Sequence, residues 1–103
     1  MVLGIYGSGG LGREILELAK QINAISNRWS KIIFIDDKKP EGTYNNTEMY
    51  PFERIDKLYD KKEIEICIAM GEPALRETIA QRVIESGYTL ATLIHPSVHV
   101  DSF

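Results

Sequence analysis

Cysteine is nearly missing from this 103-residue chain, in which Cys67 stands alone. A disulfide within the chain is therefore excluded, and a single thiol fits the reducing environment of the cytoplasm. Cys67 lies within an apolar run, where a free cysteine usually behaves as a small hydrophobe with an inert thiol. No apolar run approaches the roughly 20 residues that a membrane-spanning helix needs, and the N-terminal run is too short for a signal peptide. We therefore expect a cytoplasmic protein with no membrane partner.

An excess of positive charge is also missing, because 12 Lys and Arg residues stand against 15 Asp and Glu residues. Nucleic-acid-binding domains carry a basic surface, so we expect no nucleic-acid partner. Histidine is scarce, with only His95 and His99. Because Pro96 disfavours helix at His95, the two histidines do not form the one-faced pair of a helical metal site, and we expect no metal. A nucleophilic pair of Cys67 and His95 stays open, although no third orienting residue is evident.

Glycine, in contrast, is concentrated in segment 7–12, which reads Gly-Ser-Gly-Gly-Leu-Gly. This segment follows a short apolar run and precedes apolar residues at helical spacing. A turn of this kind from strand to helix directs unpaired backbone N–H groups toward an anion. Gly7, Gly9 and Gly12 match the nucleotide-binding fingerprint, so we favour a nucleotide ligand over a purely structural turn. The apolar residues of the following helix are Leu11, Ile15, Leu18, Ala19, Ile22 and Ile25.

Apolar runs and helical patterns alternate along the chain. We expect strands at 2–6, 32–35, 64–70 and 90–94, a short helical turn at 55–59, and long helices after 10 and after 73. Continuous apolar strands that alternate with helices predict a parallel sheet covered on both faces. The polar, turn-rich segment 41–50 is expected to be a surface loop. The sequence thus predicts an α/β fold, a small Rossmann-like domain with a four-stranded parallel sheet flanked by helices.

The second long helix has clear boundaries in the sequence. Pro73 suits the first helical position because proline lacks the N–H that would be unpaired there, and Gly87 is expected to end the helix. Its predicted apolar stripe consists of Leu75, Ile79, Ala80, Val83 and Ile84.

Ligands of such sheets bind beyond the carboxyl ends of the strands, near the switch in strand order. Three polar segments are expected to meet there: 8–12, 36–38 and 71–76. Asp36 follows Gly12 by 24 positions, close to the spacing of a ribose-binding carboxylate. A strand-ending turn is the alternative interpretation of the acidic pair.

Several other side chains are candidates for this site. Lys38 could balance a phosphate, and Arg76 could either contact an anion or pair with a neighbouring glutamate, Glu72 or Glu77. The aromatic residues Tyr44, Tyr50 and Phe52 could cover a base, although loop aromatics of this kind more often serve packing.

Four segments together resemble the N-terminal domain of the sialic acid O-acetyltransferase family, which includes pilin-glycosylation and amino-sugar N-acetyltransferases. They are residues 5–14, 34–37, 69–71 with Arg76, and 91–97, the last reading Ala-Thr-Leu-Ile-His-Pro-Ser. The resemblance implies an enzyme of bacterial glycan biosynthesis that uses acetyl-CoA to acetylate a nucleotide-linked sugar, with a UDP-sugar first among the candidates.

The resemblance also implies which residues hold the sugar nucleotide. Those near the ligand would be Gly7, Ser8, Gly9 and Gly10, with Asp36, Asp37 and Lys38 on the nucleotide side and Gly71 in the same cleft. Glu72 departs from the short Asp or Asn that is usual after this glycine, which leaves the helix at Pro73 without its best N-cap.

In that family, the segment that resembles 91–97 leads into a left-handed β-helix of hexapeptide turns, which carries acetyl-CoA, the catalytic histidine and the trimer contacts. We therefore assign residues 1–96 to the Rossmann-like domain and residues 97–103 to the start of a missing hexapeptide domain. Neither His95 nor His99 matches the catalytic histidine, so no catalytic residue is assigned. The intact enzyme is expected to be a homotrimer, whereas this piece alone is expected to bind no acetyl-CoA and to be inactive.

Two other interpretations stay open. One is a free-standing regulatory module that binds NAD or a similar dinucleotide, because Gly7, Gly9, Gly12 and Asp36 fit it equally well. The other is a scaffold domain that binds no ligand.

Overall fold

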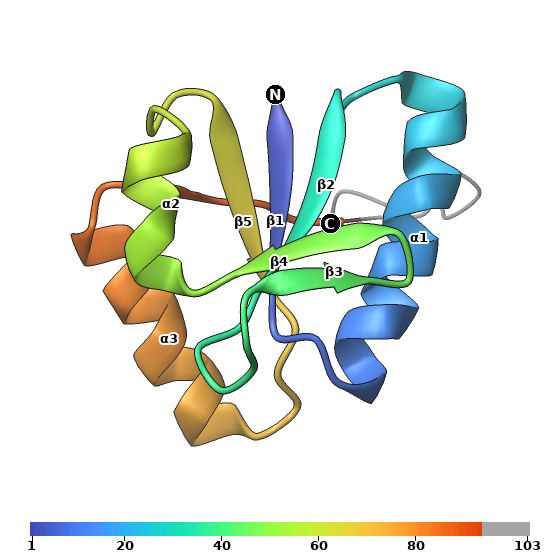
Figure 1. Cartoon of the computed structure of the whole chain (residues 1–103). Helices are drawn as coiled ribbons and strands as arrows, with labels where there is room; N and C mark the ends of the chain where they lie inside the picture. The colour runs from blue at the N-terminus through green and yellow to red at the C-terminus, as the bar shows by residue number, and fades with distance from the viewer. Residues whose placement is uncertain (94–103) are drawn as a thin grey trace, which may run out of the picture.

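Three parallel strands form the centre of the sheet (Figure 1). Strand β1 (Val2–Tyr6) lies between β2 (Lys31–Ile35) and β5 (Ile64–Ile68). These strands are the continuous apolar runs of the sequence, and most of their side chains are buried, as in parallel sheets that helices cover on both faces. The computed structural model describes residues 1–93. In them the full strand order is β3-β4-β2-β1-β5-β6.

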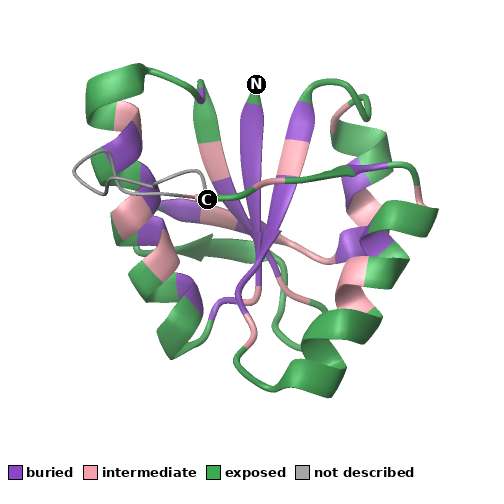
Figure 2. Ribbon diagram, turned by 180° about the vertical axis from the view of Figure 1, so that it is seen from behind, coloured by how far each residue is buried: buried purple, intermediate pink, exposed green. Residues whose placement is uncertain are grey.

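The two faces of the sheet are covered by different helices. Helix α1 (Gly10–Ser26) lies on one face, and α2 (Phe52–Leu58) and α3 (Pro73–Glu85) lie on the other. Figure 2 shows that burial is concentrated in the central strands and on the sheet-facing sides of the helices. The core under α1 includes Leu3, Ile5, Leu16, Trp29 and Phe34, and the core under α2 and α3 includes Tyr6, Ile33, Ile35, Ile66 and Val83.

Helix α1 begins within the glycine-rich segment, as predicted, but presents a partly different face to the sheet. Its buried residues are Gly12, Leu16, Ala19 and Ile22. Leu11 and Ile25, predicted to face the core, are 38% and 71% exposed. The cause is the close approach at Gly12, where a Cβ would lie 2.1 Å from the carbonyl oxygen of Gly7. The helix must turn the side that carries Gly12 toward β1. Leu16, Ala19 and Ile22 lie four, seven and ten residues further on, on the same side of the helix.

Helix α3 has the predicted ends. Pro73 is its first residue, and Gly87, with φ of +89°, follows the C-cap. The N–H of Gly87 donates to the carbonyl of Ile84 at 2.9 Å and that of Tyr88 to Val83 at 3.2 Å, the two hydrogen bonds of a Schellman motif. Of the predicted apolar stripe, Val83 is fully buried, whereas Leu75 and Ile84 are 41% and 51% exposed.

The prediction for Glu72 as an N-cap was wrong. Its side chain accepts hydrogen bonds from the N–H groups of Ala74 at 3.1 Å and Leu75 at 2.7 Å. The extended backbone of Glu72 (φ −77°, ψ 117°) lets the longer carboxylate fold back over the first turn. Glutamate therefore does here what a shorter Asp or Asn usually does.

Segment 41–50, predicted to be a loop, contains a hairpin of β3 (Gly42–Tyr44) and β4 (Thr47–Tyr50). Strand β4 pairs parallel to β2 and antiparallel to β3. Asn45 and Asn46 have φ of 51° and 60°, the left-handed values of a type I′ turn that asparagine tolerates. The side chains of β3 are exposed, so the apolar signal of a strand is missing there.

The last described strand is shorter than predicted. Strand β6 (Thr89–Leu90) pairs parallel to β5. The small Rossmann-like α/β fold is thus confirmed, with six strands within residues 1–93 in place of the predicted four and an antiparallel edge at β3. The domain boundary predicted at 96 and both histidines lie outside the described residues. Among residues 1–93, no helix is both long enough and apolar enough to cross a membrane.

Candidate functional site

A cleft of about 250 Å³ opens at the carboxyl ends of β1, β2 and β5, where the loops leave the lower edge of the sheet in Figure 1. The polar segments after β1 and β2 meet there, as predicted. The cleft is lined by Tyr6, Gly7, Ser8, Gly9, Asp36, Asp37, Lys38, Ala69, Met70, Leu75 and Ile79. Two larger hollows, of about 550 and 570 Å³, lie beside α2 and include none of the glycine-rich segment.

The glycines of the segment after β1 fall into two groups. The fold itself requires Gly7 and Gly12, since Gly7 has φ of +116° and a Cβ there would lie 2.6 Å from the carbonyl oxygen of Ala69. At Gly9 and Gly10, a Cβ would meet no atom within 4 Å. The N-cap residue of α1 is Gly9, which has no side chain to accept a hydrogen bond from the first turn of the helix. Packing therefore does not explain the second pair of glycines, and no side chain of these two residues covers the N-terminal end of α1.

Ser8 and Asp36 are joined across the loops after β1 and β2. The Ser8 hydroxyl donates to Oδ2 of Asp36 at 2.6 Å, and the Ser8 N–H donates to the same oxygen at 3.2 Å. The N–H of Lys38 donates to Oδ1 at 2.9 Å. Partial burial acts to raise the pKa of Asp36, but the hydrogen bonds from Ser8 and Lys38 outweigh it and lower this pKa below its ordinary value. The carboxylate is ionised at neutral pH and can still accept a hydrogen bond at Oδ1.

Asp37 connects three elements of the fold. Its Oδ1 accepts the N–H of Phe52, the first residue of α2, at 2.8 Å, and so caps that helix. Its Oδ2 accepts the hydroxyl of Tyr6 and the guanidinium of Arg82, the latter at 3.1 Å. Burial and the hydrogen bond to Asp37 raise the pKa of Tyr6 far above its ordinary value, so this hydroxyl keeps its proton. Asp37 lines the cleft, but both of its oxygens are already engaged by the fold.

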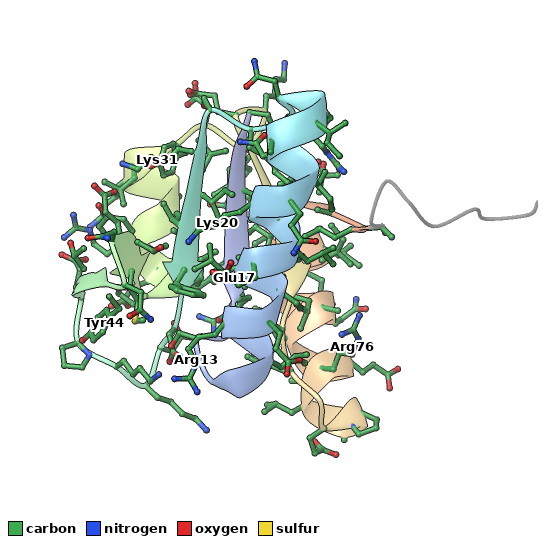
Figure 3. All side chains as sticks on the ribbon, turned by 90° about the vertical axis from the view of Figure 1, so that its right-hand side faces the viewer. Arg13, Glu17, Lys20, Lys31, Tyr44 and Arg76 are labelled. Carbon is green, nitrogen blue, oxygen red and sulfur yellow. The ribbon has the colours of Figure 1, made fainter. Side chains whose placement is uncertain are left out.

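The structure does not bring all of the predicted site residues to the cleft. Gly10 and Gly71 are not among the lining residues, although a Cβ at either would meet no atom within 4 Å. Arg76, on α3 (Figure 3), donates to the carbonyl oxygen of Ile68 at 3.1 Å rather than pairing with a neighbouring glutamate. Lys38 is the predicted cation that lines the cleft.

Cys67 and Arg76 line a second cavity of about 220 Å³, between α1 and residues 91–93. Burial raises the pKa of the Cys67 thiol to about 12, which agrees with the predicted inert thiol. The predicted pairing of this thiol with His95 falls outside the described residues. Among residues 1–93, no three His, Cys, Asp or Glu residues gather closely enough to hold a metal ion.

The three aromatic candidates for covering a base do not line the cleft, which supports the packing interpretation. Phe52 is buried and packs between Tyr6 and Tyr88, with ring centroids 5.4 and 5.5 Å away. The Tyr50 hydroxyl donates to Glu48. Tyr44, at the exposed edge of the sheet in Figure 3, donates to the carbonyl of Pro40 at 3.0 Å and so fixes the loop after β2.

Sequence reasoning missed one wall of the cleft. It is formed by the apolar side chains of Ala69, Met70, Leu75 and Ile79. In the sequence, these residues belong to a buried strand and to the apolar stripe of a helix, so nothing distinguishes them from core residues. The position of α3 on the sheet leaves a large part of the Leu75 side chain exposed, and this position cannot be read from the sequence.

This chain is similar to one family of domains and to a solved acetyltransferase domain. The family model described as the PglD N-terminal domain matches residues 2–83. Two solved structures of the acetyltransferase domain of PglB from Neisseria gonorrhoeae FA1090 match with TM-scores of 0.78 and with 26% and 25% sequence identity. The second of them is a complex with acetyl coenzyme A. Each match covers 92% of this chain and 44% of the solved chain, so this chain spans less than half of their length. No curated protein matches it.

Proposed function

Because this chain belongs to the PglD N-terminal domain family, we propose that it is the sugar-nucleotide-binding domain of an acetyltransferase of bacterial glycan biosynthesis. The enzyme would transfer an acetyl group from acetyl-CoA to an amine or hydroxyl of a nucleotide-linked sugar, with a UDP-sugar as the first candidate. The solved PglB acetyltransferase domain with acetyl coenzyme A supports the choice of acetyl donor. The cytoplasmic location expected from the sequence is part of the same proposal.

The observation that carries the proposal is that Asp36 lines the same cleft as Gly9, whose backbone no side chain covers. Asp36 lies at the end of β2, held in an ionised state by Ser8, where it can accept a hydrogen bond from a ribose hydroxyl. The uncapped start of α1 offers N–H groups and a partial positive charge to a diphosphate. Lys38, from the adjoining loop, adds a full positive charge.

Acetyl transfer itself is assigned to a second domain, which would begin near residue 97 and form the homotrimer. In this proposal the acceptor nitrogen or oxygen attacks the carbonyl carbon of the acetyl thioester, and the CoA thiolate leaves. A histidine of the second domain takes the proton of the acceptor as a general base. The role of residues 1–93 is to bind and orient the nucleotide end of the substrate.

The alternative of a dinucleotide-binding module supplies the control ligand. In dinucleotide-binding domains the strand order is 3-2-1-4-5-6, built from two mononucleotide-binding halves. Strands β4, β2, β1, β5 and β6 correspond to the first five of these positions, and β6 has only two residues in the described part of the chain. NAD would therefore find one well-formed half site, and we expect it to bind more weakly than a sugar nucleotide.

Thermal unfolding in the presence of nucleotides tests the proposal. At a concentration 100 times its dissociation constant, a ligand should stabilise the fold by about 2.7 kcal/mol. For a domain of this size, that corresponds to a rise in Tm of roughly 10–20 °C. We expect this rise with a UDP-, dTDP- or GDP-sugar and its loss in Asp36→Ala. A rise in Tm with NAD alone would overturn the proposal. The absence of a rise with every sugar nucleotide would overturn it as well.

A further inference from the structure

The apolar wall of the cleft lies opposite its polar loops. Ala69 and Met70 follow β5, and Leu75 and Ile79 lie on the adjacent side of α3. None of these four side chains carries a hydrogen-bond donor or a strong acceptor. Leu75 is 41% exposed, so a large part of this apolar side chain remains open to a ligand at the rim of the cleft. The side chains of this wall can contact the face of a ring but cannot hydrogen-bond to the polar groups on its edge.

The polar side chains of the cleft are largely occupied by one another. The Ser8 hydroxyl donates to Asp36, and the Tyr6 hydroxyl donates to Asp37 and accepts from Arg82 at 3.0 Å. Asp37 is engaged at both oxygens by Tyr6, Arg82 and the start of α2. Asp36 also accepts at both oxygens, but its donors are the neutral Ser8 and the backbone N–H of Lys38, whereas Asp37 forms an ion pair with Arg82. Among the described residues that line the cleft, the side chains whose charge remains for a ligand are therefore those of Asp36 and Lys38. Their charges suit ribose hydroxyls and phosphates, respectively.

Resting on the proposed function, we infer that the cleft recognises the ribose and diphosphate of its nucleotide and holds the base by apolar contact alone. Recognition would then depend on the size of the base and not on its hydrogen-bonding edge. Uracil and cytosine separate these possibilities because their rings are nearly the same size. Uracil presents an acceptor oxygen where cytosine presents a donor amino group. The cleft should therefore take UDP and CDP derivatives alike.

The two kinds of base recognition predict ratios of dissociation constants that differ enough to be measured. An apolar site cannot strongly reject a ligand of the same shape, whereas a site that hydrogen-bonds to its substrate rejects the mismatched analogue by roughly 10⁴-fold or more. For this cleft, the dissociation constants of UDP and CDP should agree within about tenfold. A deoxyribose analogue, dUDP, lacks the 2′-hydroxyl and should bind more weakly than UDP, since Asp36 loses a donor.

The decisive experiment is calorimetric titration of the chain with UDP, CDP and dUDP. It is repeated for two variants of α3, one at Leu75 and one at Ile84. Leu75→Ser should weaken UDP and CDP by the same factor, roughly tenfold, because the wall that both bases contact is shortened. Ile84→Ser is the matched control, since Ile84 is 51% exposed on the same helix and does not line the cleft. It should leave both affinities unchanged, and the Tm of each variant without ligand shows that it is folded.

The outcomes separate this inference from the proposed function. Similar affinities for UDP and CDP, both reduced by Leu75→Ser, would support it. UDP binding more than about tenfold tighter than CDP would overturn it and leave the sugar-nucleotide proposal standing, because the base edge would then be read. Unchanged affinities in Leu75→Ser would also overturn it. Failure of both UDP and CDP to bind would overturn this inference, whereas the proposed function is overturned only if the UDP-, dTDP- and GDP-sugars also fail to raise the Tm.

Discussion

The hydroxyl of Ser8 donates to Oδ2 of Asp36 at 2.6 Å, so that the loop after β1 fixes a carboxylate in the loop after β2. Ser8 is only 6% exposed, which is unusual for a serine in a glycine-rich turn. Its side chain is therefore better described as a support for Asp36 than as a direct ligand contact. The Ser8 N–H donates to the same oxygen at 3.2 Å, so the backbone of Ser8 supports Asp36 as well.

Replacing Ser8 by alanine tests this support. The variant loses a hydrogen bond to a charged group, and we expect the free energy of unfolding to fall by about 1.5–3 kcal/mol. Denaturant unfolding followed by fluorescence of Trp29 measures it, since Trp29 is 1% exposed. Ser30→Ala is the control, because the Ser30 hydroxyl makes an exposed 3.3 Å contact with the Met1 carbonyl and should change stability by less than about 0.5 kcal/mol. An equal effect of both substitutions would contradict the supporting role.

The stability contributed by Asp36 should depend on pH in a defined direction. Its pKa in the folded chain is lowered below the ordinary value of 3.8. The contribution is therefore fully present above about pH 4–5 and is lost as the pH falls through the folded pKa. Denaturant midpoints at pH 7 and pH 3, compared between the natural chain and Asp36→Asn, measure this. The difference between the two proteins should shrink at pH 3, and a difference that grows on acidification would refute the assignment.

The two groups of glycines should respond differently to alanine. Gly12→Ala places a Cβ 2.1 Å from a backbone oxygen, and we expect a loss of about 3 kcal/mol in stability. Gly10→Ala adds a methyl group in open space at the first position of α1. It should leave stability unchanged or raise it by up to about 1 kcal/mol. Circular dichroism during heating distinguishes the two, and a strong loss in Gly10→Ala would show that packing, not a ligand, requires this glycine.

The hydrogen bonds around Asp37 should be coupled in a double-mutant cycle. Asp37→Ala removes the cap of α2 and the partner of Arg82, and we expect a loss of about 2–4 kcal/mol. Tyr6→Phe removes one hydroxyl and should cost about 1 kcal/mol. In the double variant, the second substitution should cost much less than in the natural chain. Additive losses would mean that the two groups act independently.

The buried thiol offers a chemical test of the core. Burial raises the pKa of Cys67 to about 12, so at pH 8 almost none of it is thiolate. We expect a thiol reagent such as a dithionitrobenzoate to react with Cys67 only when the chain unfolds. The measured reaction should therefore accelerate with denaturant in step with the loss of Trp29 fluorescence. Rapid reaction in the folded state would show that the cavity beside α1 opens readily.

Local signals in the sequence predicted much of the fold. The three central strands are continuous apolar runs, and Pro73 and Gly87 mark the ends of α3 through backbone chemistry that depends on few neighbours. The hairpin was missed because β3 is exposed and short, so the Asn45–Asn46 pair was its main signal.

The site was harder to predict because its contacts join residues that are far apart in the chain. Asp36 was identified from its spacing after the glycines, but its partner Ser8 lies 28 positions earlier. Asp37 was expected to face the nucleotide, and nothing nearby indicates that it caps a helix beginning 15 residues later. Such contacts are visible only when the strands are already side by side.

The central position of β1 has a consequence for how the chain is made. Strand β1 precedes both of its neighbours along this chain, and the second neighbour, β5, ends at Ile68. Synthesis must therefore reach Ile68 before the middle of the sheet can close. Until then, the edge of β1 is unpaired and open to other strands. A chaperone that holds nascent chains should protect this domain chiefly during that interval.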